Sequence, residues 1–127
     1  MRVVDTSAWI EWFISSPTGD AIKPHLPGPE DWIVPTIVQL ELTKWLTREV
    51  GDDSANRTIA LSSTFQDVPL DTALALAAAS ICAETKLATA DAIVYATALS
   101  KGADVLTCDA AFEGLPGVIF VDKRRNA

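Results

Sequence analysis

At 127 residues, of which 49 % are hydrophobic and 21 % charged, the chain has the size and balance of one globular domain with a single core, residues 1–127. Its net charge of −7 argues against a general coat for nucleic acid, because nonspecific duplex binding needs many Lys and Arg side chains at phosphates. The helical segments are too short or too interrupted to cross a bilayer, and the first residues lack the basic start and apolar run of a signal peptide. We therefore expect a cytoplasmic protein without membrane contact.

Strands and helices are predicted to alternate along the chain, because short β-branched runs are followed by longer segments with helical propensity. Pro35 is expected as the first residue of the third helix, and the tail 123–127 is expected to fray. A turn is expected at Gly51 and the acids that follow it. The expected strands are 2–4, 31–35, 67–70, 103–107 and 118–122, and the expected helices are 6–15, a short one within 16–31, 35–50, 54–64, 71–86, 87–102 and a turn at 110–114.

This alternation predicts an α/β fold, in which a mainly parallel central sheet is covered by helices on both faces as a three-layer α/β/α domain. Ligands of such sheets bind at the carboxyl ends of the strands. The strand at 2–4 runs into Asp5, and the strand at 103–107 leads to Asp109. We therefore expect these two carboxylates to be neighbours.

Each of four acidic residues has an ordinary explanation when it is taken alone. Asp5 and Asp109 fit helix N-caps, and Asp91 fits the first turn of a helix, where the helix dipole favours negative charge. Glu41 fits a surface ion pair with Lys44, one turn along its helix. However, Glu41 falls on the apolar side of that helix, and the helix that Asp91 opens carries no other charge in its first three turns.

Together, the four carboxylates predict a metal centre, because buried carboxylates need cations or hydrogen bonds and few basic residues lie near these four. Oxygen ligands suit Mg²⁺, with Mn²⁺ as a substitute. The single histidine, His25, lacks the partners of a zinc site, and no G-x-S-x-G nucleophile elbow is present for a Ser-His-Asp triad. A metal-activated water is then the natural nucleophile, which indicates phosphodiester hydrolysis by one or two metal ions.

Four short motifs resemble the acidic signature of PIN-domain ribonucleases: VVDTSAWI with Asp5, QLELTKW with Glu41, TADAIVYATA with Asp91 and LTCDAAF with Asp109. Chain length and element order are similar to the VapC type of toxin from toxin-antitoxin pairs. The resemblance extends over essentially the whole chain, and its specificity lies in the order and context of the four acids. It implies a PIN-like α/β/α fold, Mg²⁺- or Mn²⁺-dependent endonucleolytic cleavage of RNA, a role as the toxin, and inhibition by a cognate antitoxin.

Carried over residue by residue, the resemblance assigns the whole acidic signature to catalysis and metal binding: Asp5, Glu41, Asp91 and Asp109. Asp5 and Asp91 are the first choices for direct ligands. Three hydroxyl residues match positions where the family often has hydroxyl or amide groups, and we expect them to orient carboxylates or waters: Thr6, Ser7 and Thr107. The resemblance also implies a homodimer, and a heterotetramer or larger assembly with the antitoxin.

RNA binding by this acidic chain requires a local basic patch. Lys44 and Arg48 follow Glu41 on the same predicted helix and are candidates for phosphate contacts, although a solvated helix face explains them equally well. The basic run 123–125 is a further candidate for phosphate contacts, although a solubilising tail is its favoured explanation.

Four tryptophans are unusual beside one Tyr and four Phe. Core packing is expected for at least two of them. The segment AWIEWFI is nevertheless apolar on every side, and packing on a sheet from one side leaves part of such a helix exposed. We expect Trp9, Trp12 and Phe13 to form the surface that receives an antitoxin helix or extended segment.

Two alternatives to the nuclease remain open. VVDTS is also similar to the start of haloacid-dehalogenase-type phosphatases, but Ser7 stands where their second acid is expected, and no cap domain is evident. A PIN-like domain kept as a non-catalytic binding module is the second alternative, and only a metal-dependent activity would exclude it. A receiver domain is disfavoured, because no acidic pair ends the first strand.

Overall fold

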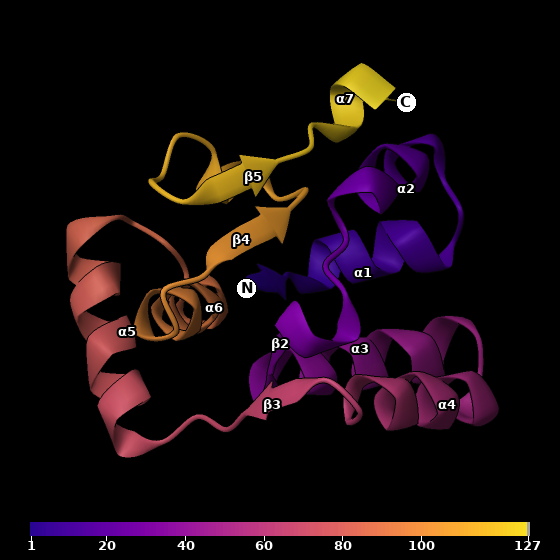
Figure 1. The fold of residues 1–127 in the computed structure, drawn as a ribbon, viewed down its shortest axis with the longest axis horizontal. Helices are drawn as coiled ribbons and strands as arrows, with labels where there is room; N and C mark the ends of the chain where they lie inside the picture. Colours follow the sequence, from indigo (N-terminus) through magenta and orange to yellow (C-terminus); the bar gives the residue numbers. More distant parts are fainter. Residues whose placement is uncertain (127) are drawn as a thin grey trace.

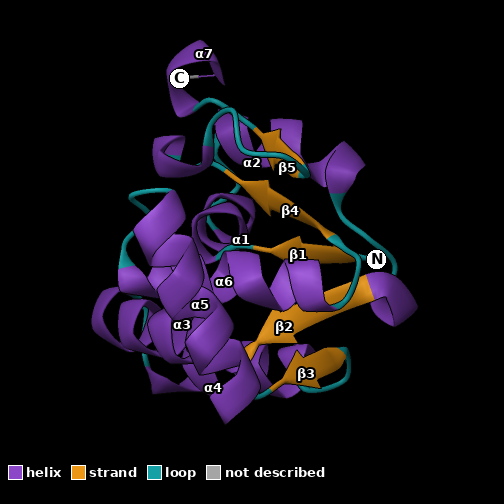
Figure 2. Ribbon diagram, turned by 90° about the vertical axis from the view of Figure 1, so that its left-hand side faces the viewer, coloured by secondary structure: helices purple, strands orange, loops and turns teal. Residues whose placement is uncertain are grey.

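The computed structural model describes residues 1–126 and has a central sheet of five parallel strands. The strands are β1 (Arg2–Val4), β2 (Trp32–Pro35), β3 (Gln66–Val68), β4 (Asp104–Thr107) and β5 (Val118–Phe120). Their order across the sheet is β3-β2-β1-β4-β5, which Figure 2 shows from bottom to top. The carboxyl ends of β1 and β4 are therefore neighbours, at the place where the chain changes the direction in which it adds strands.

Helices follow the strands and flank the sheet, which confirms the predicted α/β fold class. Figure 1 shows α5 and α6 on one side of the view and α1 to α4 on the other. No single helix within residues 1–126 is long and apolar enough to cross a bilayer, and only α5 and α6 together, bent by 115°, reach that length and composition. The helices are α1 (Thr6–Phe13), α2 (Pro17–Ile22), α3 (Thr36–Glu49), α4 (Asp52–Ser62), α5 (Thr72–Glu84), α6 (Thr89–Ser100) and α7 (Lys123–Asn126), with 3-10 turns η1 (Lys23–His25), η2 (Pro29–Asp31) and η3 (Ala110–Phe112).

The core lies between the three central strands and the helices that pack on them. Residues 92–98 of α6 are all buried, which explains why this segment carries no charge. Burial of each large aliphatic side chain contributes roughly 1.5–3 kcal/mol. The hydrophobic strand residues with no exposed surface are Val3, Val4, Ile33, Val34, Val105 and Leu106. This packing fixes the ends of β1, β4 and α6 relative to one another.

Several local predictions differ from the structure. Pro35 ends β2 and occupies the N-cap position of α3, because its ψ of 138° is extended rather than helical. Asp52 and Asp53, expected in a turn, form the first turn of α4, where the helix dipole stabilises their charge. Residues 16–31 hold 3-10 turns as well as one short helix. The tail is the short helix α7 rather than a frayed end, and its last expected residue, Ala127, lies outside the described residues.

Candidate functional site

The structure brings the four predicted acidic residues together at the carboxyl edge of the sheet. Asp5 directly follows β1, and Asp109 follows β4 and precedes η3. Glu41 lies on α3, and Asp91 lies in the first turn of α6. All four line one pocket of about 500 Å³. Four elements that are far apart in the sequence thus contribute carboxylates to a single hollow.

Asp5 is buried, with 4 % of its surface exposed, and two hydroxyls hold its carboxylate. Ser7 Oγ and Thr107 Oγ1 donate to Asp5 Oδ2 at 3.0 and 2.8 Å. The same two hydroxyls accept from the backbone N–H groups of Cys108 and Asp109, each at 3.0 Å. Although Asp5 occupies the N-cap position of α1, its side chain makes no capping hydrogen bond, so the ordinary N-cap explanation is wrong for this residue. The network instead fixes the orientation of a buried carboxylate.

Glu41 is half-buried and is held from α1. Thr6 Oγ1 donates to Glu41 Oε1 at 2.8 Å. Within residues 1–126, Glu41 has no ion pair with Lys44, so the surface-pair explanation for this acid is also wrong. Each hydroxyl for which we predicted an orienting role therefore makes a hydrogen bond to one of the acidic residues.

The pocket disfavours negative charge at two of its carboxyl groups. Burial raises the pKa of Asp91 to about 7, and the charges of Asp109, Asp5 and Glu41 act in the same direction. Burial also raises the pKa of Asp5, against the effect of the hydrogen bonds from the two hydroxyls. Neighbouring carboxylates that repel one another in this way favour a bound cation.

The carboxylate oxygens of the pocket are suitable ligands for a hard divalent cation, although the side chains alone do not complete its coordination sphere. Across the part of the chain that the structure describes, no group of three or more His, Cys, Asp or Glu side chains is arranged to hold a metal ion. Mg²⁺ commonly takes only one or two carboxylates directly and keeps several waters, so it needs no complete protein cage. Asp5 and Asp91 remain the residues that we would assign as direct ligands.

Two further charged residues line the acidic pocket: Glu11 on α1, which the sequence did not single out, and Lys123 on α7, which belongs to the basic run 123–125. Glu11 lies four residues after Ser7, so helical spacing places both on one side of α1, a signal that was available from the sequence. The position of Lys123 depends on how α7 packs, which the sequence does not reveal. Lys44 and Arg48 instead line a hollow of about 230 Å³.

The predicted aromatic surface is a separate groove between α1 and α4. Trp9, Trp12 and Phe13 line it, and its volume is about 420 Å³. Trp9 is 2 % exposed and Trp32 is 4 % exposed, which confirms core packing for at least two tryptophans, whereas Phe13 is 42 % exposed. The opposite wall of the groove comes from α4: Ser54, Arg57, Thr58 and Leu61.

A parallel sheet of order 3-2-1-4-5 with carboxylates from four elements at one edge defines an α/β/α domain with an acidic site. Residues 2–118 match the PIN domain family. The chain therefore belongs to the PIN domain family, as its acidic motifs indicated. It has no detectable match among curated protein sequences.

Solved structures share this fold at low sequence identity. A toxin-antitoxin complex from Klebsiella pneumoniae contains a chain that is 23 % identical, with a TM-score of 0.82 over 96 % of this chain and 98 % of that chain. VapC20 of Mycobacterium tuberculosis, described as a sarcin-ricin loop cleaving toxin, is 22 % identical, with a TM-score of 0.74 over 93 % and 97 %. FitAcB from Neisseria gonorrhoeae is 22 % identical, with a TM-score of 0.73 over 94 % and 96 %.

Proposed function

We propose that this PIN-domain protein is a metal-dependent endoribonuclease that acts as the toxin of a toxin-antitoxin pair. The observation that carries the proposal is the convergence of Asp5, Glu41, Asp91 and Asp109 in one pocket, where the pKa of Asp91 is raised to about 7. Membership of the PIN domain family supports a nuclease. The likeness in fold to VapC20 and to chains of toxin-antitoxin complexes supports the toxin role.

In the proposed reaction, the chain holds the metal and orients its ligands. A bound Mg²⁺ or Mn²⁺ would lower the pKa of a water and stabilise negative charge on a phosphoryl oxygen. Ser7 and Thr107 hold the Asp5 carboxylate in one orientation. The carboxylate therefore needs little further ordering when a metal ion binds. Thr6 does the same for Glu41. Asp91 must lose its proton on loading, because a ligand carboxylate binds in its charged form.

The proposed substrate is RNA, and its phosphates need cations beside the acidic pocket. Lys44 and Arg48 line a hollow that adjoins the pocket and shares Thr6, Glu41 and Trp45 with it. Arg48 Nε already donates to Glu49 at 2.8 Å, so Lys44 is the stronger candidate of the two for a phosphate contact.

We further propose that the groove between α1 and α4 binds the antitoxin. Phe13 and Leu61 expose 42 % and 44 % of their surface there, and Arg57 places one positive charge in a largely apolar lining. This combination suits an apolar helix or extended segment that carries one acidic side chain opposite Arg57. The homodimer, its heterotetrameric or larger complex with the antitoxin, and the cytoplasmic location stay predictions.

The two alternatives, a phosphatase and a non-catalytic binding module, predict different assay results. The match to the PIN domain family favours a nuclease over a haloacid-dehalogenase-like phosphatase, which would hydrolyse a phosphate monoester such as p-nitrophenyl phosphate. A non-catalytic PIN-like binding module would hydrolyse neither substrate.

The test is cleavage of total cellular RNA by purified wild type and Asp5→Asn, each with Mg²⁺, with Mn²⁺ and with EDTA. Asp31→Asn, an exposed residue on η2, is the matched control. We expect discrete fragments that require metal, persist in the control and vanish in Asp5→Asn. Absence of fragments from the folded wild type under all conditions would contradict the nuclease, and hydrolysis of p-nitrophenyl phosphate would then support the phosphatase.

A further inference from the structure

One cation lies among the residues that line the acidic pocket. Lys123 on α7 is the only Lys or Arg in that lining, which otherwise brings five carboxylates together: Asp5, Glu11, Glu41, Asp91 and Asp109. An RNA strand that enters this pocket carries a negative charge on each phosphate and meets repulsion from the acids. A positive charge at the rim offsets this repulsion at short range. Lys123 is exposed and, within residues 1–126, takes part in no ion pair.

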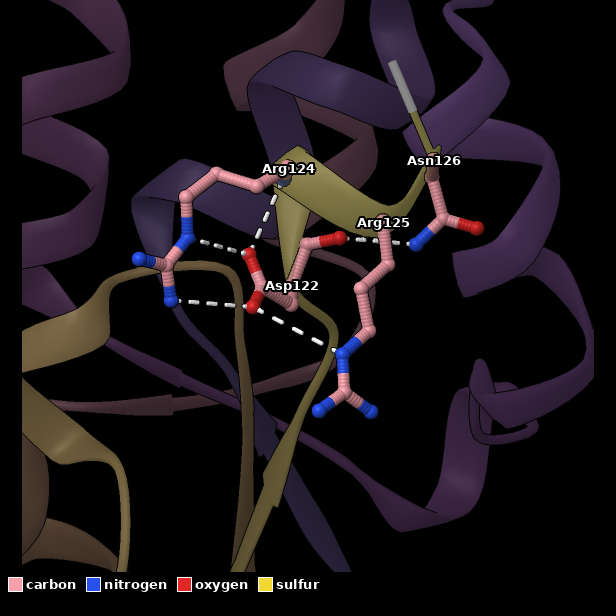
Figure 3. Close-up of polar contacts among 4 residues, drawn as sticks. All are labelled: Asp122, Arg124, Arg125 and Asn126. Carbon is pink, nitrogen blue, oxygen red and sulfur yellow. Dashed lines mark hydrogen bonds and ion pairs between the residues drawn. The ribbon is translucent and has the colours of Figure 1, made fainter.

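Hydrogen bonds to Asp122 hold the segment that carries Lys123 in place (Figure 3). The Asp122 carboxylate accepts from the backbone N–H of Arg124 at 2.9 Å and from Arg124 Nε and Nη2 at 3.1 Å each. Asn126 Nδ2 donates to the Asp122 carbonyl at 2.8 Å. Figure 1 shows α7 beside α2, and the two helices are in contact. The basic segment is therefore an ordered element at the carboxyl end of β5.

The acidic pocket continues toward this segment. A second hollow of about 350 Å³ shares Ser7, Asp109 and Lys123 with the pocket and adds Phe120 and Arg124 to its lining. Arg124 binds Asp122 through Nε and Nη2, which leaves Nη1 for another acceptor, and its side chain is 78 % exposed. Lys123 thus lies where the two hollows meet.

Cations therefore flank the carboxylates on two sides. The hollow that holds Lys44 and Arg48 adjoins the pocket at Glu41 on α3, and the hollow that holds Lys123 and Arg124 adjoins it at Asp109. Neighbouring phosphates of one strand lie on both sides of the bond to be cleaved, so a substrate strand needs cations on both sides.

We propose that Lys123 and Arg124 bind the RNA phosphate on the Asp109 side of the cleavage site, so that the substrate strand crosses the pocket from α3 to α7. This inference rests on the proposed ribonuclease function and identifies how that site holds its substrate. Lys123 is a positioning residue in this arrangement, because it binds a phosphate that is not transferred.

The test compares Lys123→Ala, Arg124→Ala and Lys123→Arg with wild type. Lys101→Ala is the matched control, because Lys101 is an exposed lysine that follows the carboxyl end of α6, whereas Asp91 lies at the other end of that helix. Binding of a fluorescently labelled single-stranded RNA is measured by anisotropy in EDTA over a range of salt concentrations. The kcat and KM for cleavage of the same RNA are measured with Mg²⁺, and thermal unfolding checks that each variant is folded.

We expect Lys123→Ala to weaken RNA binding by about 5- to 10-fold. The negative slope of log K against log salt should become shallower by about 0.7, which is the value for one lost phosphate contact on a single strand. KM rises by a similar factor while kcat changes little, and Lys123→Arg restores both binding and KM. Arg124→Ala acts in the same direction with a smaller effect, because part of its guanidinium is held by Asp122.

Two results would overturn the proposal, and they are distinguishable. If wild type cleaves RNA but Lys123→Ala and Arg124→Ala bind it as the Lys101→Ala control does, the basic segment is a solubilising tail and the ribonuclease function stands. If wild type neither binds nor cleaves the RNA, the proposed function fails, and the inference fails with it.

Discussion

The acidic pocket and the aromatic groove lie on two sides of one helix, α1. Ser7, Glu11 and Ile14 line the pocket at intervals of three or four residues, whereas Trp9, Trp12 and Phe13 line the groove. A helix that is apolar nearly all round would be fully buried in an ordinary core. In this chain α1 is not completely buried, because Phe13 and Ile14 remain 42 % and 48 % exposed. Its apolar side chains instead line two hollows, Phe13 the groove and Ile14 the pocket.

The two regions are held together by different physical interactions. In the pocket, hydrogen bonds to Asp5 compensate a buried carboxyl group, and the loss of one partner leaves a polar group unpaired. In the groove, Trp9 packs against Trp12 with ring centroids 5.9 Å apart, and Trp9 also contacts Trp32, which lies outside the groove lining and stacks on Phe65 at 4.6 Å. A substitution of Trp12 removes none of the hydrogen bonds to Asp5, which come from Ser7 and Thr107. Substitutions should therefore separate catalysis from partner binding.

The largest effect is expected for Asp5→Asn in the pocket. The amide keeps the volume of the side chain but removes the negative charge that we propose as a direct ligand of the metal. We expect kcat/KM for RNA cleavage to fall by about 10³-fold or more, because the substitution removes a group that helps to stabilise charge in the transition state. Cleavage of a defined RNA with Mg²⁺ measures this. A variant that keeps a tenth of the wild-type rate would contradict a central role for Asp5.

In the groove, Trp12→Ala should reduce affinity for the antitoxin by roughly 30-fold, the effect of an aromatic anchor at an interface. Leu76→Ala on α5 is the control, because Leu76 is 67 % exposed and does not line the groove. Affinity is measured by calorimetry with the product of an adjacent short reading frame as the candidate antitoxin. Equal affinity of wild type and Trp12→Ala, in proteins with matching thermal unfolding, would remove the groove as the docking surface.

The substitution Thr107→Val tests the role of the Thr107 hydroxyl, which links the end of β4 to Asp5. Thr107 has no exposed surface, donates to Asp5 and accepts from the backbone N–H of Asp109. We expect cleavage to fall by about 10- to 100-fold and the free energy of unfolding by roughly 1–3 kcal/mol, because Asp5 loses a partner and the N–H of Asp109 is left unpaired.

The matched control for that substitution is Thr97→Val. Thr97 is 1 % exposed, and its hydroxyl donates only to the Ile93 carbonyl within α6, so its loss should leave cleavage unchanged and stability within about 1 kcal/mol. Equal effects of the two substitutions on cleavage would show that the hydroxyl of Thr107 has no special role at the site.

The sequence predicted the convergence of the four carboxylates, because carboxylates in apolar segments are chemically conspicuous. Asp5 and Asp109 follow predicted strands, and the rule for parallel sheets places such residues at one edge. Glu11 was missed although its spacing from Ser7 was visible, because a single charge on an apolar helix looks like a solvated position. The basic run that contains Lys123 was visible in the sequence, but its place at the pocket was not, because that depends on the packing of a four-residue helix, which no periodicity reveals.

The fold class was likewise predictable from the alternation of elements, while strand order and element ends were not. The order 3-2-1-4-5 depends on which strands pair across the sheet, and local residue preferences do not determine these pairings. Pro35 illustrates the limit at an element end. Its fixed φ, −62°, suits both the first turn of a helix and an extended strand, and pairing of Pro35 with Val68 of β3 decides between them.

The smallest expected effect concerns the burial of Asp91 and its repulsion by the neighbouring carboxylates, and it depends on pH. The pKa of Asp91 is raised to about 7 in the folded protein, so between about pH 4 and pH 7 the folded state binds more protons there than the unfolded state does. Stability of the metal-free protein should therefore fall as pH rises through this range. Asp91→Asn removes the titrating group and should stabilise the metal-free protein by about 1–2 kcal/mol at pH 8, a value reduced by solvent screening of this half-buried group.

This gain should be small near pH 4, where Asp91 is protonated in the folded state and about half protonated in the unfolded state, and it should shrink at pH 8 when Mg²⁺ binds the wild-type carboxylate. Urea unfolding of both proteins in EDTA at pH 4, 6 and 8, and at pH 8 with Mg²⁺, measures the difference. A gain that stays constant across pH would mean that Asp91→Asn acts through packing. The cost of charging Asp91, by burial and by repulsion from the other carboxylates, would then not be what distinguishes the pocket from the groove.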